Sequence, residues 1–319
     1  MTEASFFEPL NFDDQRLRIL DGGMGALIEK LGFDPSKTVA WSSGANVTDP
    51  ELVFKAHMAF IEAGAEVILT NTYQANIKRL AHSFSPSETL NHVRRGVELA
   101  LEAAQKSGKT IRIVGSIGSY ATYLADGSEY TGSYTTDPSF DLDLIYANYK
   151  TQALELFQNG VRMFAFETTP SVAEAKVARR VLEQLSSEGF DIYGWVSAQC
   201  KDYEHLANGD KFVDFVSALA DSPRVRAIGI NCTSPQHVGS LLRHGHTVAN
   251  GKAFVVYPNS GENFNKDLKV YFGNPRTERI LQEMEEWTKL GVRLIGGCCR
   301  VTPDDLKQIA KRAEELKIA

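Results

Sequence analysis

Three of the four cysteines have a spacing that could do chemistry. Cys298 and Cys299 are adjacent and follow two glycines, and Cys232 ends the apolar run 227–231. Neighbouring side chains of a regular strand point to opposite faces, so two cysteines aimed at one point need a strand that has ended or twisted. The preceding glycines permit that change. Three thiolates from two strand ends predict a zinc site with an open fourth position, the pattern of a catalytic zinc.

The alternative is that these cysteines are structural. Cysteine is a small hydrophobe that is often buried, so a single thiol at a strand end indicates packing as readily as metal binding. The adjacent pair favours a metal, because thiolates are strong zinc ligands and a disulfide between neighbouring residues would be strained.

Polar residues also end several of the predicted strands, namely Asp21, Asn71, Glu167 and Asn231. In a barrel of parallel strands the active site lies at the carboxyl ends of the strands. The carboxylates of Asp21 and Glu167 could hold an ammonium group there through charge-assisted hydrogen bonds. Each could instead cap the helix that follows its strand, but their joint occurrence favours ligand binding.

Short apolar segments that alternate with amphipathic helical segments indicate the fold. The predicted strands are residues 17–23, 66–72, 111–118, 162–168, 192–198, 226–232, 253–258 and 292–297. This alternation predicts a parallel sheet, and the count of eight favours an α/β fold with a single closed (β/α)8 TIM barrel. A doubly wound open sheet is the alternative. No Gly-x-Gly-x-x-Gly motif opens the first helix, which weakens the dinucleotide-binding version of that fold.

Local signals mark several helices. Asp49 before Pro50 predicts a helix start, Ser171-Val172-Ala173-Glu174 predicts a capping box, and the apolar spacing predicts a helix over 142–158. The stretch 119–140 after the third strand is too long for an ordinary connection.

Composition and length bound the class of protein. With 319 residues, of which 43% are hydrophobic, the chain can bury a large core. Residues 1–14 lack a period and are predicted to form a loose arm, and residues 15–319 the barrel domain. The formal charge of −6 without a basic block argues against nucleic-acid or anionic-membrane partners. No signal peptide or bilayer-spanning run is found, so we expect a cytoplasmic protein with reduced thiols, as a monomer or small homo-oligomer.

The remaining candidates for chemistry are weaker. None of the seven histidines ends a predicted strand, and His244 and His246 flank a glycine in a turn that we expect to be solvated. Cys200 follows the fifth strand. We interpret it as a rim or structural thiol, because a fixed fourth sulfur would close the zinc site to substrate.

Four motifs together resemble the homocysteine S-methyltransferase family. They are Asp21-Gly22-Gly23-Met24-Gly25, Thr70-Asn71-Thr72-Tyr73, Gly229-Ile230-Asn231-Cys232 and Gly296-Gly297-Cys298-Cys299, in family order. The resemblance runs from about Leu17 to about Arg312. It implies a (β/α)8 barrel with zinc held by Cys232, Cys298 and Cys299. It further implies that Asp21 and Glu167 bind the homocysteine amino group, that Gly22 and Thr70 lie by its carboxylate, and that Asn231 supports the site.

The resemblance implies methyl transfer to the sulfur of homocysteine. The nucleophile is a thiolate, and an unperturbed thiol titrates at roughly 8.5. Zinc would bind the homocysteine sulfur as thiolate. That sulfur would attack a methyl group on a positively charged donor and give methionine. No catalytic residue beyond the zinc site is expected.

Two segments indicate the methyl donor. Tyr73-Gln74-Ala75-Asn76 and the tyrosine-rich stretch 120–130 resemble the family branch that uses S-methylmethionine, and often S-adenosylmethionine. The betaine-dependent branch has a further tyrosine where this chain has Gln74. Aromatic rings suit a sulfonium cation through cation–π attraction. Alternatively, Tyr120, Tyr123 and Tyr130 only hold down a long loop. We expect S-methylmethionine to be preferred, with weaker transfer from S-adenosylmethionine and little from betaine.

Other functions stay open at this point. A betaine-dependent homocysteine methyltransferase is the nearest alternative. A transferase or lyase with Cys232 as nucleophile would need a nearby base, and no histidine ends a predicted strand. A structural zinc that pins the barrel would usually have four protein ligands. Because no corrinoid-binding or folate-binding domain follows the barrel, the cobalamin-dependent synthases are a poor match.

Overall fold

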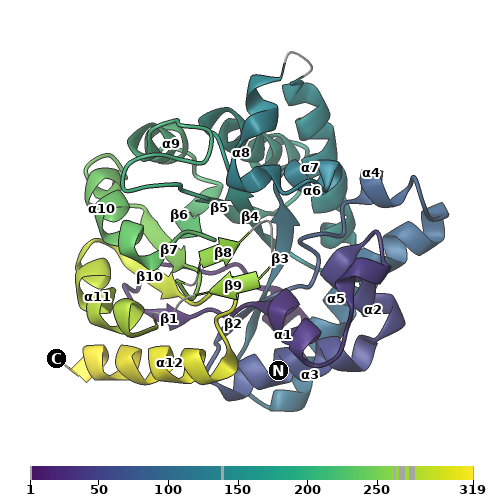
Figure 1. Cartoon of the computed structure of the whole chain (residues 1–319), viewed down its shortest axis with the longest axis horizontal. Helices are drawn as coiled ribbons and strands as arrows, with labels where there is room; N and C mark the ends of the chain where they lie inside the picture. The colour runs from purple at the N-terminus through teal and green to yellow at the C-terminus, as the bar shows by residue number, and fades with distance from the viewer. Residues whose placement is uncertain (1, 138–139, 262, 266–269, 273–276, 319) are drawn as a thin grey trace.

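Eight parallel strands form a barrel in the order β1-β10-β7-β6-β5-β4-β3-β2 (Figure 1). The computed structural model describes residues 2–137, 140–261, 263–265, 270–272 and 277–318. The barrel strands are β1 Arg18–Ile19, β2 Val67–Leu69, β3 Arg112–Gly118, β4 Met163–Thr169, β5 Tyr193–Ala198, β6 Val225–Asn231, β7 Ala253–Tyr257 and β10 Val292–Ile295. A parallel bridge between Leu20 and Val67 joins β1 to β2 and closes the ring. The predicted TIM barrel is confirmed, and the open sheet is excluded.

The strands form where apolar residues run together, because a parallel strand of a barrel is buried on both faces. Every residue of β4 is buried, as are all residues of β3 and β5 except the first of each. All eight predicted strands are present, shorter by a residue or more at most ends.

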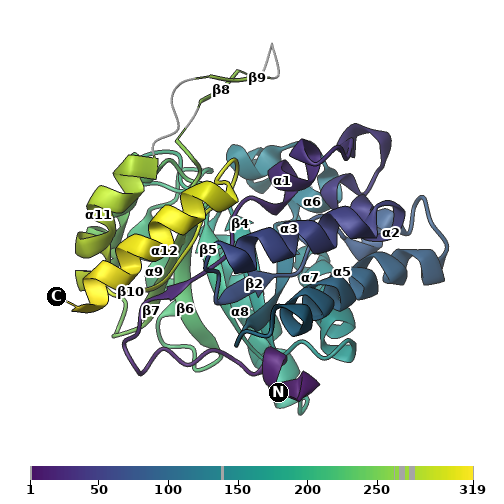
Figure 2. The same cartoon turned by 90° about the horizontal axis from the view of Figure 1, so that it is seen from below.

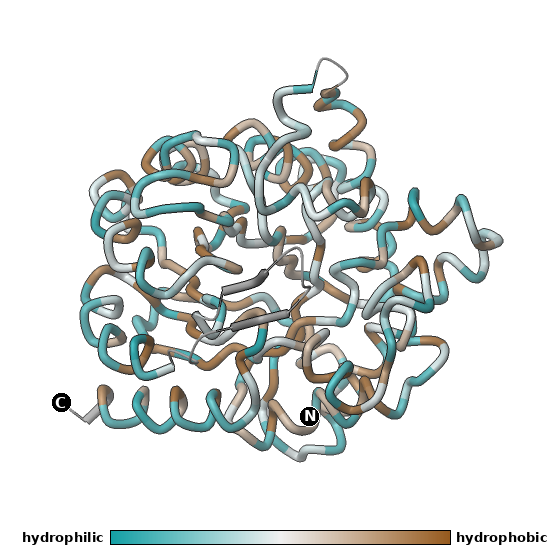
Figure 3. Tube along the Cα trace, in the orientation of Figure 1, coloured by the Kyte–Doolittle hydropathy of each residue, from teal (hydrophilic) through white to brown (hydrophobic). Residues whose placement is uncertain are grey.

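Helices surround the barrel and cover its outer face. They are α1 Met24–Lys30, α2 Ala45–Thr48, α3 Pro50–Glu62, α4 Ile77–Leu80, α5 Pro86–Ser107, α6 Ala121–Leu124, α7 Leu142–Gln158, α8 Val172–Ser187, α9 Phe212–Leu219, α10 Pro235–His246, α11 Thr277–Lys289 and α12 Pro303–Ile318. The prediction for 142–158 is confirmed by α7. Along α12, hydrophobic and hydrophilic residues alternate in Figure 3, as expected for a helix with one face on the barrel. Leu306, Ile309 and Ala313 provide that face.

Helix α3 begins at Pro50 after Asp49, as predicted, but neither of the two predicted caps makes its full set of hydrogen bonds. The side chain of Asp49 makes no capping hydrogen bond at the start of α3. At α8, Ser171 Oγ accepts from the amide of Glu174 at 3.1 Å, but the Glu174 carboxylate bonds elsewhere and does not return to Ser171. The capping box at α8 is therefore only half formed.

The amino-terminal segment is packed, so the prediction of a loose arm is wrong. A 3-10 helix spans Glu3–Phe7, and both of its phenylalanines are buried. Leu10 and Phe12 join the buried cluster that fills the barrel interior. These apolar residues are buried although their spacing matches neither a helix nor a strand. The sequence pattern therefore did not predict a packed segment there.

A two-stranded hairpin that the sequence analysis did not predict follows β7. Its strands, β8 Asn263–Asn265 and β9 Val270–Phe272, pair antiparallel. Figure 1 draws the hairpin across the centre of the barrel, and Figure 2 shows it extending away from the end opposite the amino terminus. Among the described residues, no helix combines the length and apolar character needed to span a bilayer.

Candidate active site

The three predicted cysteine ligands meet at the carboxyl ends of β6 and β10. The sulfur atoms of Cys232, Cys298 and Cys299 all lie within 4.8 Å of one another. Cys232 Sγ is 3.8 Å from Cys299 Sγ. Four thiolates around a tetrahedral zinc at about 2.3 Å have sulfurs roughly 3.8 Å apart, so this edge fits the metal. The cluster is able to hold a metal ion.

Cys232 and Cys298 are joined by a disulfide in this structure, with their Cα atoms 5.5 Å apart. This pair differs from the expectation of reduced thiols, whereas Cys200 and Cys299 are free. Metal ligands must be thiolates, so metal binding by all three cysteines requires this bond to be reduced first.

Glycines bring the ends of β1 and β10 together. The amide of Gly297 donates to Asp21 O at 3.0 Å. A Cβ on Gly296 would lie 2.5 Å from Asp21 O, and one on Gly23 would lie 2.5 Å from Cys298 O. The glycines are thus needed for close backbone approach, which sets Asp21 beside the cysteines. After β6, in contrast, the left-handed backbone that turns the chain falls on a cysteine and not on a glycine, since Cys232 has a φ of 47°.

Asp21 and Glu167 are both buried and interact electrostatically. Burial raises the pKa of Asp21 well above its ordinary value, the amide of Leu69 lowers it, and the charge of Glu167 raises it further. Leu69 N donates to Asp21 Oδ2 at 2.8 Å. Burial raises the pKa of Glu167 to about 7, although hydrogen bonds from Ser116 and Tyr257 lower it. Two carboxyl groups whose negative charges are poorly compensated favour a cationic ligand.

Tyr257 supports Glu167 from inside the barrel, and the sequence analysis did not identify it. Its hydroxyl lies 2.6 Å from Ser197 Oγ and accepts from Trp195 Nε1 at 3.1 Å. Tyr257 ends β7, so its position at a strand end was the signal that could have revealed it.

Gly22 and Thr70, the two residues expected near the substrate carboxylate, are constrained in different ways. A Cβ on Gly22 would lie 2.5 Å from the ring of Phe60, so only glycine fits there. Thr70 Oγ1 accepts from Ser116 N at 3.0 Å and lies 2.6 Å from Thr72 Oγ1. Because Thr72 donates to the carbonyl of Ser116, Thr70 donates to Thr72, and its hydroxyl is used locally.

Asn231 links the ends of β6 and β4. Its Oδ1 accepts from Thr168 N at 2.8 Å, and its Nδ2 donates to Thr168 Oγ1 at 2.9 Å. Thr168 has a φ of 61°, an outlier for a β-branched residue. Asn231 therefore holds a strained backbone between Glu167 and the strand end that carries Cys232. Asn71, in contrast, binds Ser42 O and Asn46 Oδ1 and anchors a neighbouring loop.

Aromatic residues reach the cysteines from the long stretch after β3. Tyr130 Oη lies 3.9 Å from Cys299 Sγ, and the charge of Cys299 is the main cause that raises the pKa of Tyr130. Burial raises the pKa of the Cys299 thiol, while its hydrogen bond with Tyr130 lowers it. Burial, followed by the charge of Glu129, raises the pKa of Tyr73. Tyr73, Glu129 and Tyr130 thus belong to the same site as Cys299.

Cys200 and the two flanking histidines lie outside this site. Cys200 is buried, its amide donates to Thr233 Oγ1 at 2.9 Å, and it does not belong to the sulfur cluster found among the described residues. His244 and His246 are exposed in the last turn of α10, as predicted.

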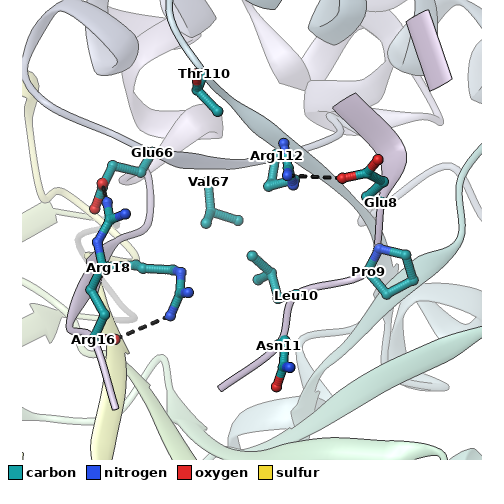
Figure 4. A pocket seen from close by; sticks show the side chains of 10 residues that line it. All are labelled: Glu8, Pro9, Leu10, Asn11, Arg16, Arg18, Glu66, Val67, Thr110 and Arg112. Atoms are coloured by element: carbon teal, nitrogen blue, oxygen red, sulfur yellow. Dashed lines mark hydrogen bonds and ion pairs between the residues drawn. The ribbon is translucent and has the colours of Figure 1, made fainter. Parts of the chain in front are cut away.

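A pocket of about 410 Å³ lies at the opposite end of the barrel, where β1, β2 and β3 begin (Figure 4). Its arginines are paired with carboxylates: Arg112 with Glu8 at 3.0 Å, and Arg18 with Asp14 at 3.1 Å. Polar features at the amino ends of barrel strands serve stability, whereas catalytic groups lie at the carboxyl ends.

Comparison with known proteins agrees with this geometry. Residues 18–313 match the family model described as homocysteine S-methyltransferase. The chain belongs to the homocysteine S-methyltransferase family. Homocysteine S-methyltransferase 2 of Arabidopsis thaliana is 34% identical, with 98% of each chain covered. Homocysteine S-methyltransferase YbgG of Bacillus subtilis is 33% identical over 96% of this chain and 97% of its own.

Solved structures of the family superimpose on the whole barrel. The metallated form of the homocysteine methyltransferase MmuM from Escherichia coli matches with a TM-score of 0.79 and 31% identity, covering 94% of this chain and 98% of MmuM. Its oxidized form matches with a TM-score of 0.80 and 30% identity, covering 94% and 97%. This member of the homocysteine S-methyltransferase family is thus a methyltransferase on a TIM barrel.

Proposed function

We propose that this enzyme is zinc-dependent and moves a methyl group from a sulfonium donor, preferably S-methylmethionine, to the thiolate of L-homocysteine, giving methionine. The observation that carries the proposal is the set of three cysteine sulfurs within 4.8 Å of one another, next to two buried carboxyl groups. Sulfur ligands suit zinc, and the carboxyl groups suit the ammonium of an amino acid.

Cys232, Cys298 and Cys299 would hold the zinc after the disulfide is reduced. Bound zinc would supply a Lewis acid that keeps the homocysteine sulfur deprotonated near neutral pH. In the metal-free site, burial raises the pKa of Cys299. This thiol is therefore protonated at neutral pH, and metal binding must release its proton.

Asp21 and Glu167 would orient homocysteine through its ammonium group. Their interaction with each other raises the pKa of Asp21, and a cation between them would reverse that effect. Such a charged pair fixes one end of the substrate and aligns its sulfur with the donor. Thr70 Oγ1 is engaged with Thr72 and Ser116, so any contact from Thr70 to the substrate carboxylate requires a local rearrangement.

Tyr73, Glu129 and Tyr130 provide a surface for a cationic donor. The aromatic rings would attract the sulfonium, and Glu129 would favour the positive charges of the donor. Gln74 Oε1 accepts from Ser42 N at 3.2 Å and Ser42 Oγ at 3.3 Å. This position therefore offers no ring to a quaternary ammonium, which favours a sulfonium donor over betaine.

The proposal is tested by supplying each donor separately to reduced, zinc-loaded enzyme with homocysteine and measuring methionine. We expect the highest kcat/KM with S-methylmethionine, a lower value with S-adenosylmethionine and little product from betaine. A preference for betaine would contradict the donor assignment. Full activity after complete removal of metal would contradict zinc dependence.

A further inference from the structure

Glu174 is a buried carboxylate that the reaction proposed above does not use. It lies in the first turn of α8, and its side chain is 0% exposed. Its Oε1 accepts from the amide of Tyr120 at 2.7 Å and from the hydroxyl of Tyr149 at 2.5 Å. Its Oε2 accepts from the hydroxyl of Tyr134. A fully buried carboxylate requires such donors, so this arrangement is built around Glu174.

Two of these donors, Tyr120 and Tyr134, lie near the two ends of one segment of the chain. We call residues 119–136 the tyrosine segment; it follows β3 and contains α6 and two short 3-10 helices. Tyr120 lies near its start and Tyr134 near its end. Their rings also meet edge to face, with centroids 5.7 Å apart. Glu174 therefore fixes both ends of the tyrosine segment at a single point on α8.

Most of the backbone hydrogen bonds within this segment are local. Ala125 N donates to Ala121 O, Tyr130 N to Gly127 O, and Gly132 N to Ser128 O. Local turns shape a loop but do not place it against the barrel. Arg79 Nη1 donates to Tyr123 O at 3.1 Å and Asn76 Nδ2 to Thr122 Oγ1 at 3.4 Å, which anchors the first half of the segment. The bonds to Glu174 are the ones that join both ends of the segment to α8, across 54 residues from Tyr120 and 40 from Tyr134.

The residue placed in this way is Tyr130. It lies between the two anchored tyrosines, and its hydroxyl is 3.9 Å from Cys299 Sγ. Glu129, beside it, interacts electrostatically with Cys299 and Tyr130. In the reaction proposed above, the donor and the homocysteine sulfur would meet between the tyrosine segment and the cysteines.

We propose that Glu174 is a positioning residue for the methyl donor, because it anchors both ends of the tyrosine segment and so sets Tyr130 against Cys299. The proposal rests on the methyl transfer proposed above, and it adds a residue that touches neither substrate. An error of 1 Å in the placement of reacting groups lowers the rate by about a hundredfold in unfavourable cases. Loss of an anchor should therefore impair use of the donor more than use of homocysteine.

Two tyrosines provide a matched test. Tyr134→Phe and Tyr149→Phe each remove one hydroxyl that donates to Glu174, but only Tyr134 belongs to the tyrosine segment. Tyr149 lies on α7, where its ring packs against Phe166 with centroids 5.1 Å apart. Both variants lose one buried hydrogen bond, so we expect similar falls in Tm.

Kinetics should separate the two variants. With the donor that the wild type uses best, we expect Tyr134→Phe to lower kcat/KM for the donor by about tenfold or more. Its KM for homocysteine should stay within about twofold of wild type. Tyr149→Phe should keep both values within about threefold. Glu174→Gln, which keeps the size of the side chain but replaces one acceptor oxygen, should resemble Tyr134→Phe.

Equal losses of donor kcat/KM in the two tyrosine variants would overturn the inference. So would parallel rises in the KM of donor and homocysteine in Tyr134→Phe. Failure of the proposed function appears differently, as a wild type that prefers betaine or needs no metal. The comparison of variants uses whichever donor is active, so it tests the inference in either case.

Discussion

The chemistry of individual residues here depends on their neighbours more than on their burial. Burial raises the pKa of the thiols of both Cys200 and Cys299. Only Cys299 has two other sulfurs within reach, whereas the amide of Cys200 donates to the hydroxyl of Thr233. Both cysteines follow barrel strands, so position alone did not separate them in the sequence. The adjacent pair Cys298-Cys299, and the need of a catalytic zinc for an open fourth position, did separate them.

We expect Cys298→Ala to lose both bound zinc and methyl transfer. Removing one of three thiolates leaves too few ligands for a stable zinc site. Metal content of the reduced, zinc-loaded protein, measured by elemental analysis, tests this directly. Cys200→Ala is the matched control, since it removes a buried thiol outside the cluster and should keep stoichiometric zinc. Stoichiometric zinc in Cys298→Ala would show that the ligand set is wrong.

At the scale of elements, the site depends on how two strands end. Thr168, the penultimate residue of β4, and Cys232, just after β6, both have positive φ, at 61° and 47°. Asn231 binds Thr168 through both of its amide atoms and joins the two ends. Backbone strain of this kind costs on the order of 1–3 kcal/mol per residue and persists only where the surroundings hold it.

We expect Asn231→Ala to lower the free energy of unfolding by about 1–3 kcal/mol, because it leaves buried groups of Thr168 without partners. It should also weaken homocysteine binding, since Glu167 precedes Thr168. Thr168→Gly relieves the strain, because glycine adopts positive φ readily. In a double-mutant cycle measured by urea unfolding, the cost of Asn231→Ala should therefore be smaller in the Thr168→Gly background. Additive effects would show that Asn231 does not hold the strained backbone.

The same elements show what the sequence could predict. The barrel strands were predictable because each is a run of apolar residues with a polar residue or cysteine near its end. The cysteine and carboxylate positions followed from those ends. The left-handed turn at Thr168 was not predictable, because threonine favours extended backbone. The bond from Tyr120 to Glu174 was not predictable either, because Ser171-Val172-Ala173-Glu174 fits a capping box and so predicts a bond from Glu174 back to Ser171.

The scale of the whole molecule explains the other differences. Phe6, Phe7, Leu10 and Phe12 cover the amino end of the barrel without regular periodicity, so the sequence pattern resembled a loose arm. The disulfide between Cys232 and Cys298 joins residues 66 positions apart, and its formation depends on redox conditions that a sequence pattern does not contain. Both features arise from contacts between distant parts of the chain.

The two ends of the barrel divide stability from function. At the amino end, arginines and carboxylates are paired, as Arg112 is with Glu8. At the carboxyl end Asp21 and Glu167 are buried carboxyl groups, and burial raises the pKa of each. Burial raises the pKa of Glu167 from 4.5 to about 7. The folded state therefore holds this proton more tightly than the unfolded chain does. Stability from this group is fully present below about pH 4.5 and is lost as pH rises toward and through 7.

We expect Glu167→Gln to remove this pH-dependent loss. Gln keeps the size of the side chain but never ionises, so the variant should gain stability relative to wild type as pH rises. Between about pH 5.5 and about pH 8 the relative gain should be about 2 kcal/mol. Urea unfolding of the metal-free, reduced proteins at the two pH values measures it. The same variant should bind homocysteine more weakly at the higher pH, where the wild-type carboxylate is ionised and attracts the ammonium. A stability difference that does not change with pH would show that Glu167 is not held as a buried acid, and unchanged homocysteine affinity would show that it does not bind the ammonium.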